Sequence, residues 1–293
     1  MAKVKAQSVN RTITAIIVVI VLALGGGYLG AMLRGGGGGG GASNASAQGA
    51  FLDEIKKRGV LRVGVAISPP HTVELEDGTF GGPNIIPLEN LAKALGVKVE
   101  TVPAEWKNIV AGLQAGRYDF AANLDRTLER AVAIQFTEPV WDYPAVFLVE
   151  ADSPYATVQD LLESGGTIGT AQGTAHEAAF LRAYPDAKTA STDSFANLIQ
   201  SLRADRIIAE LADLPTAISQ AQEDPTLKII LPDPDIYRGL VAYGVPASAD
   251  ARSIQTVNVA IERALNEGVM EAAYAEVGYV TEDQLADAGL LKQ

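Results

Sequence analysis

From Phe51 onward the chain alternates short apolar runs with amphipathic segments of helical period. The apolar runs at 60–66, 97–103 and 118–124 predict strands, and the segments between them, 87–96 and 106–116, predict helices. A β-α-β-α-β order is typical of a largely parallel sheet covered by helices. The first part of the fold is therefore expected to be an α/β unit.

The same alternation returns after residue 144. Strands are expected at 145–150, 166–173, 206–213, 227–231 and 239–247, and helices at 157–165, 174–184 and 194–205, with two more helices in 250–278. A single core rarely grows beyond about 250 residues. Two α/β units are therefore expected rather than one.

The first fifty residues have a different pattern. Residues 1–11 carry only basic charges, and the uncharged run 12–33 is long enough, at about 33 Å, to cross a bilayer core as a helix. A glycine-rich tether, 34–50, follows. Basic residues before an apolar run predict a cytoplasmic stub at 1–11 and an exported remainder, periplasmic or extracellular. The run is either an uncleaved signal anchor or a long signal peptide cut after Ala47.

Composition narrows the function. The net charge of −12 argues against nucleic acid as a partner, because phosphate binding requires a basic surface. The absence of cysteine excludes disulfides, thiolate metal sites and cysteine nucleophiles. With only His71 and His176, Ser-His catalysis or a histidine-rich metal site has little to draw on, so no cofactor or metal is expected.

Ligand-binding residues in open α/β sheets lie beyond the carboxyl ends of the strands. This rule selects five loops, at 67–71, 104–106, 125–130, 172–177 and 213–215. Their side chains are the candidates for chemistry.

Arg130 is the first of these candidates. Thr127 is a suitable N-cap, which places Arg130 in the first turn of a helix, where its charge opposes the macrodipole. An anion held between the guanidinium and the free N–H groups would explain this placement. The alternative is a surface arginine paired with Glu129 or Glu138.

Three further loops carry candidates with two interpretations each. Gly173 and Thr174 form a turn into a helix whose amides could bind a negative group, or an ordinary strand-to-helix connection. Asp213 could hold an ammonium group, or cap the next helix with Pro215 near its first position. Trp106 could provide an aromatic wall for a ligand or pack in the core.

Together these loops resemble the bacterial family 3 extracellular solute-binding proteins, the amino-acid receptors of ABC importers. The similarity covers about residues 51–280 in compatible order and spacing. Residues 61–82 resemble the beginning of the family's sequence pattern. Four short motifs follow in order: Leu113, Gly116, Arg117 and Asp119; Thr127, Glu129, Arg130, Phe136, Thr137 and Pro139; Gly169, Gly173 and Thr174; and Asp213, Pro215 and Ala217.

The resemblance implies a two-lobed clamshell of the periplasmic-binding-protein type with two crossing hinge strands, preceded here by the N-terminal membrane helix. Lobe 1 would comprise 51–144 and 243–293, and lobe 2 would comprise 145–242, with the crossings near Ala145 and Ala242. Ligand binding would close the hinge, and an ABC transporter permease would recognise the closed form.

The resemblance also assigns roles to residues. Arg130 would clamp the α-carboxylate of an amino acid and Asp213 would take its α-ammonium group. The other expected ligand-binding residues are the amides of Thr174 and Ala175, the side chains of Asn123, Asp125 and Trp106, and Ser68, His71 and His176.

The chain departs from the family pattern at several positions. Asn84 and Ile86 replace two acids, His71 replaces an aromatic residue, and Ser68 stands where some binders of basic amino acids carry a tyrosine. A pocket for a cationic side chain is therefore not expected. The ligand is instead expected to be a polar or small amino acid, or another small anion.

Two other functions are compatible with the same scaffold. A dehydratase of cyclohexadienyl type needs a general acid, for which Glu177 or Glu210 could serve, but the segment after Asp213 lacks the acid found in that branch. A sensor domain would have to signal through a membrane partner. The sequence favours the receptor over both.

Overall fold

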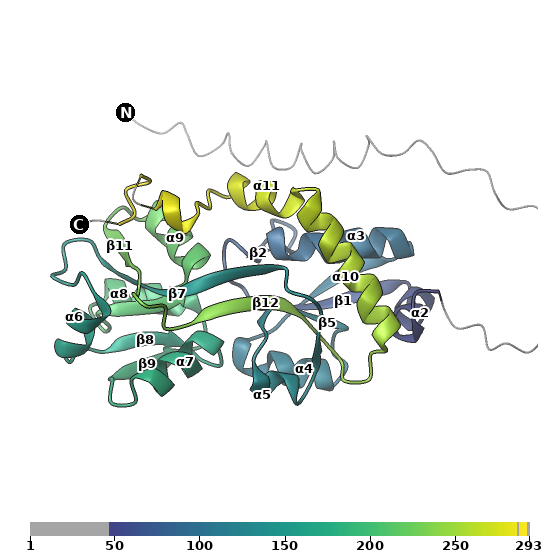
Figure 1. Ribbon diagram of the computed structural model, residues 1–293, viewed down its shortest axis with the longest axis horizontal. Helices are drawn as coiled ribbons and strands as arrows, with labels where there is room; N and C mark the ends of the chain where they lie inside the picture. Colours follow the sequence, from purple (N-terminus) through teal and green to yellow (C-terminus); the bar gives the residue numbers. More distant parts are fainter. Residues whose placement is uncertain (1–46, 286, 292–293) are drawn as a thin grey trace, which may run out of the picture. The chain divides into compact units, whose positions relative to one another are not determined.

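Two long strands, β7 (Trp141–Glu150) and β12 (Arg238–Val245), run between two groups of elements, which we call lobe 1 and lobe 2 (Figure 1). This computed structural model describes residues 47–285 and 287–291. The predicted stub, transmembrane segment and all but the end of the tether lie outside these residues. Within them, no helix combines the length and hydropathy needed to cross a membrane.

Lobe 1 is built on a sheet in the order β4-β1-β5-β12. The strands β1 (Val60–Val65), β4 (Lys98–Pro103) and β5 (Phe120–Asp125) are parallel, as expected. The helices of this lobe are α2 (Ala50–Arg58), α3 (Ile86–Leu95), α4 (Ile109–Gln114), α5 (Leu128–Ala131), α10 (Ala251–Asn266) and α11 (Val269–Glu276). Short elements complete it: β2 (Val73–Glu74), β3 (Phe80–Gly81), β6 (Gln135–Phe136), η1 (Pro83–Ile85) and η2 (Trp106–Asn108). A last short helix, η3 (Glu282–Gln284), lies in the segment after α11, which bonds to α9 and β11 of lobe 2.

Lobe 2 is built on a second set of strands in the order β7-β10-β8-β9, with β11 also paired to β7. They are β8 (Ile168–Ala171), β9 (Thr189–Thr192), β10 (Ala209–Asp213) and β11 (Leu227–Ile230). Its helices are α6 (Val158–Glu163), α7 (Ala175–Ala183), α8 (Phe195–Arg203) and α9 (Leu214–Glu223). The two lobes confirm the expected fold class.

Strand β7 changes partners along its length. Residues Trp141 to Pro144 pair with β12, whereas Ala145 to Glu150 pair with β10 and β11. Strand β12 in turn pairs with β7 at its start and with β5 and β6 toward its end. Both strands therefore join the lobes, although the lobe limits at Ala145 and Ala242 stay predictions.

Some elements were not expected from the sequence. Helix α2 buries Leu52 and Ile55, and its end is marked by Gly59, which has a left-handed conformation with φ 78°. The pair β2–β3 and strand β9 are short, so their periodicity is too weak to separate them from loops.

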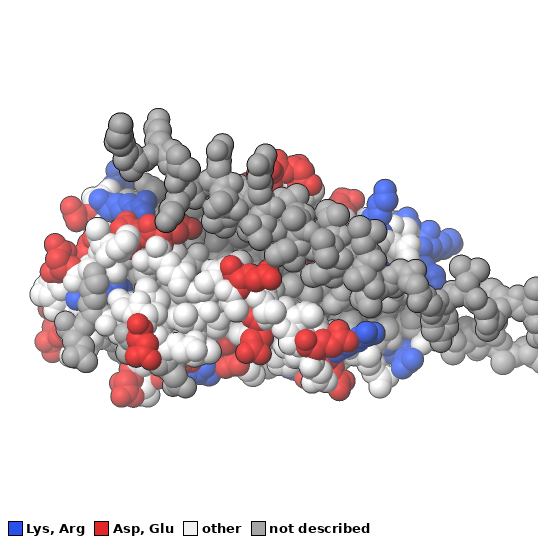
Figure 2. Space-filling model, turned by 90° about the horizontal axis from the view of Figure 1, so that it is seen from above, with Lys and Arg blue, Asp and Glu red and all other residues white. Residues whose placement is uncertain are grey.

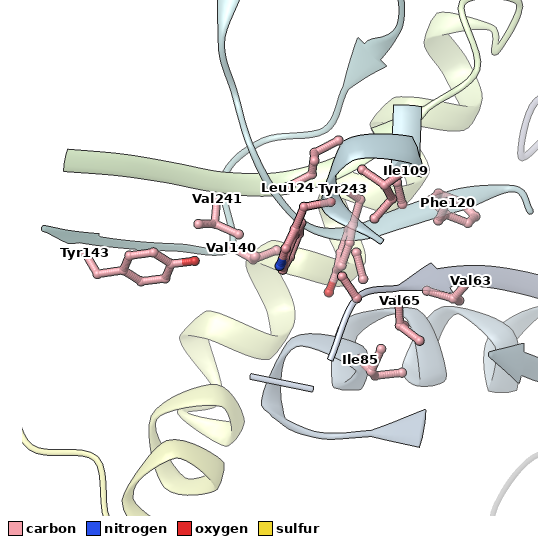
Figure 3. Close-up of a cluster of buried hydrophobic side chains, with 14 of the residues drawn as sticks. Val63, Val65, Ile85, Ile109, Phe120, Leu124, Val140, Tyr143, Val241 and Tyr243 are labelled. Atoms are coloured by element: carbon pink, nitrogen blue, oxygen red, sulfur yellow. The ribbon is translucent and has the colours of Figure 1, made fainter. Parts of the chain in front are cut away.

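The core of lobe 1 lies between β1, β5, β12 and the helices that cover them (Figure 3). The labelled side chains come from β1, β5, β7, β12, η1, α4 and the loop before β7, namely Val63, Val65, Ile85, Ile109, Phe120, Leu124, Val140, Tyr143, Val241 and Tyr243. Tyr243 donates its hydroxyl to the carbonyl of Asn84 at 2.8 Å, so this buried polar group is satisfied.

The surface agrees with the acidic composition. Figure 2 shows a face on which acidic side chains are dispersed among neutral ones, while basic side chains lie in small groups. No extended basic surface is visible among the described residues of that face, as the charge balance predicts.

A buried acid lies within lobe 2. Gln220 Nε2 donates to Glu210 Oε1 at 3.1 Å, while Glu210 Oε2 and Gln220 Oε1 have no partner. Burial raises the pKa of the Glu210 carboxyl to about 8, against the effect of the Gln220 bond. At neutral pH a protonated Glu210 supplies the donor that Gln220 Oε1 lacks, so one proton can satisfy both atoms.

This carboxyl makes stability depend on pH. Because its pKa is raised in the folded state, the folded chain keeps a proton that the unfolded chain loses near pH 4.5. The contribution is therefore complete below about pH 4.5 and is lost as pH rises toward 8. Glu210→Gln keeps both hydrogen bonds and cannot titrate. We expect the wild type to lose stability relative to this variant between pH 5 and pH 8, measured by urea unfolding; parallel curves would contradict the assignment.

Candidate functional site

Arg130 lies at the contact between the lobes and not on the open surface. Thr127 caps helix α5 and accepts the backbone N–H of Arg130, as predicted. The guanidinium donates to the carbonyl of Asp125 at 3.0 Å and, across the cleft, to the carbonyl of Gly173 at 2.9 Å. The alternative of a surface arginine paired with Glu138 applies instead to Arg126, which approaches that carboxylate at 3.7 Å.

The charge of Arg130 is largely enclosed by protein. Its side chain is only 12% exposed, and the Asp125 carboxylate lies 3.9 Å away. Burial lowers the pKa of the Arg130 guanidinium, while Asp125, Tyr237 and Tyr143 oppose the decrease. An arginine stays protonated in proteins, so Arg130 is a buried cation at the contact between the lobes.

On the lobe 2 side, a glycine turn leads from β8 into α7. Gly173 has φ 83°, and its N–H donates to the Glu177 carboxylate at 2.8 Å. Thr174 caps the helix by accepting the N–H of Glu177 at 3.2 Å, and Ala175 is buried at the first helical position. One backbone N–H group of the turn, that of Gly173, is therefore already bonded to the Glu177 carboxylate.

The turn approaches lobe 1 closely. A Cβ atom at Gly173 would lie 2.6 Å from the Cα atom of Lys107, too close for any side chain. Lys107 also forms an ion pair with Asp193 of lobe 2 at 2.5 Å. The lobes are thus in direct contact at this edge.

Asp213 confirms its predicted interpretation as a helix cap, while its binding of an ammonium group stays a prediction. It caps α9, because the N–H of Thr216 donates to Oδ1 at 2.8 Å, and it is 2% exposed at the end of β10. The same oxygen lies 3.0 Å from Nε2 of His71 in lobe 1. The other ring nitrogen of His71 is 2.6 Å from the Tyr274 hydroxyl.

The charged form of Asp213 is stabilised despite its burial. Burial by itself would raise the pKa of Asp213, but His71, His176 and the Thr216 N–H together bring it below the usual range. Asp213 is therefore an anion in a buried position, which is the requirement for binding an ammonium group.

Other predicted residues surround these two charges. Ser68 is fully buried and its hydroxyl lies 3.2 Å from that of Thr216, across the lobes. Asn123, which has φ 53°, accepts from the Asn84 amide at 2.6 Å and from the Tyr143 hydroxyl at 3.1 Å. Asn84, one of the departures from the family pattern, thus supports Asn123.

Trp106 is placed differently. Its side chain is 7% exposed and belongs to the main hydrophobic cluster, which contains residues of both lobes. This favours the core-packing interpretation, and its contact with a ligand stays a prediction.

Tyr143 connects the two ends of the site. Burial raises the pKa of its hydroxyl well above the usual range, with the carboxylates of Asp213 and Asp125 adding to the effect. Its ring centroid lies 5.0 Å from that of His71 and 6.3 Å from that of His176. The structure therefore gathers Arg130, Asp213 and both histidines around one tyrosine of the crossing strand.

The sequence did not identify Tyr143, Tyr237, Thr216 or Tyr274 as site residues. Tyr143 and Tyr237 lie on or beside the crossing strands, where neither periodicity nor a motif distinguishes a cleft residue from a core residue. Tyr274 belongs to α11 and reaches His71 only through the tertiary fold.

Two surface cavities lie elsewhere. One, of about 350 Å³, is lined by 191–206, and one of about 580 Å³ lies beside the crossing strands near Trp141 and Arg238. Neither is lined by Arg130 or Asp213. Among the described residues, no group of three or more acidic or histidine side chains could hold a metal ion.

The chain is similar to known binding proteins. The family described as bacterial extracellular solute-binding proteins, family 3, matches residues 61–277. An L-cystine-binding protein of Escherichia coli is 28% identical over 176 residues, which are 59% of this chain and 65% of that protein. The match thus spans slightly less than two thirds of that relative.

A solved structure and an enzyme add to the comparison. The cysteine-binding protein of Campylobacter jejuni superimposes with a TM-score of 0.71 at 27% identity, covering 80% of this chain and 96% of that one. A cyclohexadienyl dehydratase of Pseudomonas aeruginosa is 31% identical over 100 residues, 33% of this chain and 37% of the enzyme.

The close approach at Gly173 gives a test of lobe contact. Gly173→Ala places a methyl group against the Lys107 backbone, so we expect the lobes to separate and the radius of gyration in small-angle X-ray scattering to increase. Gly165→Ala is the matched control, since Gly165 also has a positive φ, 64°, but no atom within 4 Å of the added Cβ. Equal scattering from both variants would show that the contact does not hold the lobes together.

Proposed function

The chain belongs to family 3 of the bacterial extracellular solute-binding proteins, and on this premise we propose that it captures a small zwitterionic ligand, an amino acid, outside the cytoplasm. It delivers this ligand to the permease of an ABC transporter. The proposal rests on one observation. A buried cation, Arg130 of lobe 1, and a buried anion, Asp213 of lobe 2, both lie in the electrostatic surroundings of Tyr143 on the crossing strand.

The two charges match the two ends of an amino acid. A guanidinium can donate two parallel hydrogen bonds to a carboxylate. The Arg130 bond to the Gly173 carbonyl crosses the cleft, so a ligand carboxylate placed there would exchange a direct contact between lobes for one through the ligand. Asp213 would accept from the α-ammonium group, and the amides of Thr174 and Ala175 would assist the carboxylate.

Closure follows from the same contacts. Arg130 with Gly173, His71 with Asp213 and Ser68 with Thr216 each join a residue of lobe 1 to one of lobe 2. A ligand that bonds to both lobes favours the closed form by its differential affinity for that form. The permease would recognise the closed form, as the resemblance implies.

A binding role is favoured over the dehydratase alternative. Asp213 is followed by Leu214 and Pro215, and neither can donate a proton. Glu210 is bonded to Gln220, and Glu177 accepts from Gly173, Thr170 and Ser191. Both carboxylates are therefore bonded to other groups of the protein, which does not favour either of them as the general acid of a dehydratase.

The role of Arg130 can be measured by thermal shift with the twenty amino acids. A ligand at one hundred times its Kd stabilises the folded state by about 2.7 kcal/mol, or about 5–10 °C in Tm for a chain of this size. Arg130→Ala should abolish the shift. Arg126→Ala, four residues earlier in the chain and 38% exposed, should leave it unchanged. An unaltered shift in a folded Arg130→Ala variant would place the anion clamp elsewhere.

We also propose that residues 12–33 anchor the chain in the cytoplasmic membrane. The support is the basic stub before an uncharged run of sufficient length. Expressed in a bacterium, the full-length protein should remain with the membranes after an alkaline carbonate wash. Release as a soluble chain that begins at Gln48 would show instead that the segment is a cleaved signal peptide.

A further inference from the structure

His176 is a buried side chain without any hydrogen-bond partner. It occupies the second position of α7, directly after Thr174 and Ala175, and is 5% exposed. Neither Nδ1 nor Nε2 has a partner among the described residues. A buried polar group left unpaired is costly, so both nitrogens require an explanation.

The imidazole belongs to the site of Arg130 and Asp213. Its ring centroid lies 6.3 Å from that of Tyr143 and 5.4 Å from that of Tyr237, the latter at an angle of 84°. Tyr143 and Tyr237 both lie in the electrostatic surroundings of Arg130, and His176 lies in those of Asp213. The ring therefore contacts the two tyrosines that surround Arg130 and lies in the same charged environment as Asp213.

The other histidine of the site provides a contrast. His71 uses both ring nitrogens, one toward Asp213 and one toward Tyr274. The imidazole of His176 is thus the one of the two whose hydrogen-bonding capacity is left for a ligand.

The charges around His176 limit what the ligand side chain can be. Asp125 is near Arg130, and its free Oδ1 atom is directed at the Gly239 backbone, where an added Cβ would collide with it. Asp213 already accepts from His71 and Thr216. Because Asp213 is taken by the α-ammonium group and the free oxygen of Asp125 lies against Gly239, neither carboxylate is placed to receive a cationic side chain beside His176.

An anionic side chain also lacks a partner. Arg130 would hold the α-carboxylate, and Lys107 at the cleft edge is paired with Glu105 and Asp193. An apolar side chain would leave the imidazole unsatisfied. A neutral imidazole has one donor and one acceptor nitrogen, and hydroxyl and amide groups both donate and accept.

We infer that His176 is the specificity-determining residue of this site and that it selects amino acids with a neutral hydrogen-bonding side chain, a hydroxyl or an amide. This inference rests on the proposed function, because it takes Arg130 and Asp213 as the groups that hold the ligand backbone. It adds the class of side chain that the chain accepts.

The experiment compares ligands of nearly equal shape on the full-length protein by isothermal titration calorimetry. The pairs are threonine with valine, serine with alanine and glutamine with methionine. We expect the wild type to bind the polar member of at least one pair about tenfold or more tightly than its apolar counterpart, since an unmatched buried donor or acceptor weakens binding by at least this order.

Three variants assign the preference to the imidazole. His176→Phe keeps a ring beside Tyr143 and Tyr237 but removes both nitrogens, so the preference should disappear. His176→Leu serves the same purpose if the phenylalanine variant does not fold, as judged by circular dichroism. His176→Asn keeps a donor and an acceptor and should retain part of the preference.

The outcomes separate the two proposals. Tight binding of valine or methionine, or of a cationic or acidic amino acid in preference to the polar ones, would overturn the inference and leave the receptor intact. An unchanged preference in His176→Phe would do the same. Failure of the wild type to bind any amino acid would refute the proposed function, and the inference with it.

Discussion

The guanidinium of Arg130 joins the two lobes, and much of the site depends on where it is held. It donates to a carbonyl at the end of β5 and to a carbonyl of the turn before α7, so it belongs to both lobes at once. Its side chain is almost enclosed by protein, so water contributes little to stabilising its charge. The nearest carboxylate, that of Asp125, is 3.9 Å away and beyond hydrogen-bond distance, so a closer anion would stabilise this buried charge further.

The opposite end of the site is organised around Asp213. The carboxylate is fixed by the start of α9 and by His71, and these partners keep it ionised. Tyr143 lies within the field of both charges and comes from the strand that changes sheets. The candidate site residues His71 and His176 are therefore in contact with the strand that changes sheets. A movement of the lobes cannot leave the site unchanged.

The sequence predicted the regular elements of both lobes because their apolar periodicity is strong, as in β1, β5 and β10. It also placed Thr127 and Thr174 at helix starts and Asp213 at the end of a strand, since capping preferences are local. The partners of these residues come from distant segments. The contact of His71 with Asp213 spans 142 positions, and local pattern contains no information about it.

The short elements and the aromatic residues of the cleft were not predictable in the same way. Strand β9 and the pair β2–β3 are too brief to show a period. Tyr143 and Trp106 are buried aromatic residues of the same hydrophobic cluster, yet only Tyr143 also lies beside the charges of Asp213 and Asp125, and only the tertiary fold distinguishes them.

The bond between Tyr274 and His71 extends the site to the far end of the chain. Tyr274 lies in α11, after the last strand of either sheet, and its hydroxyl occupies the imidazole nitrogen that faces away from Asp213. A chain that ended before α11 would keep every strand and both charged residues. It would nevertheless leave the Nδ1 atom of the buried His71 ring without its partner, so an intact sheet does not by itself satisfy the polar groups of the candidate site.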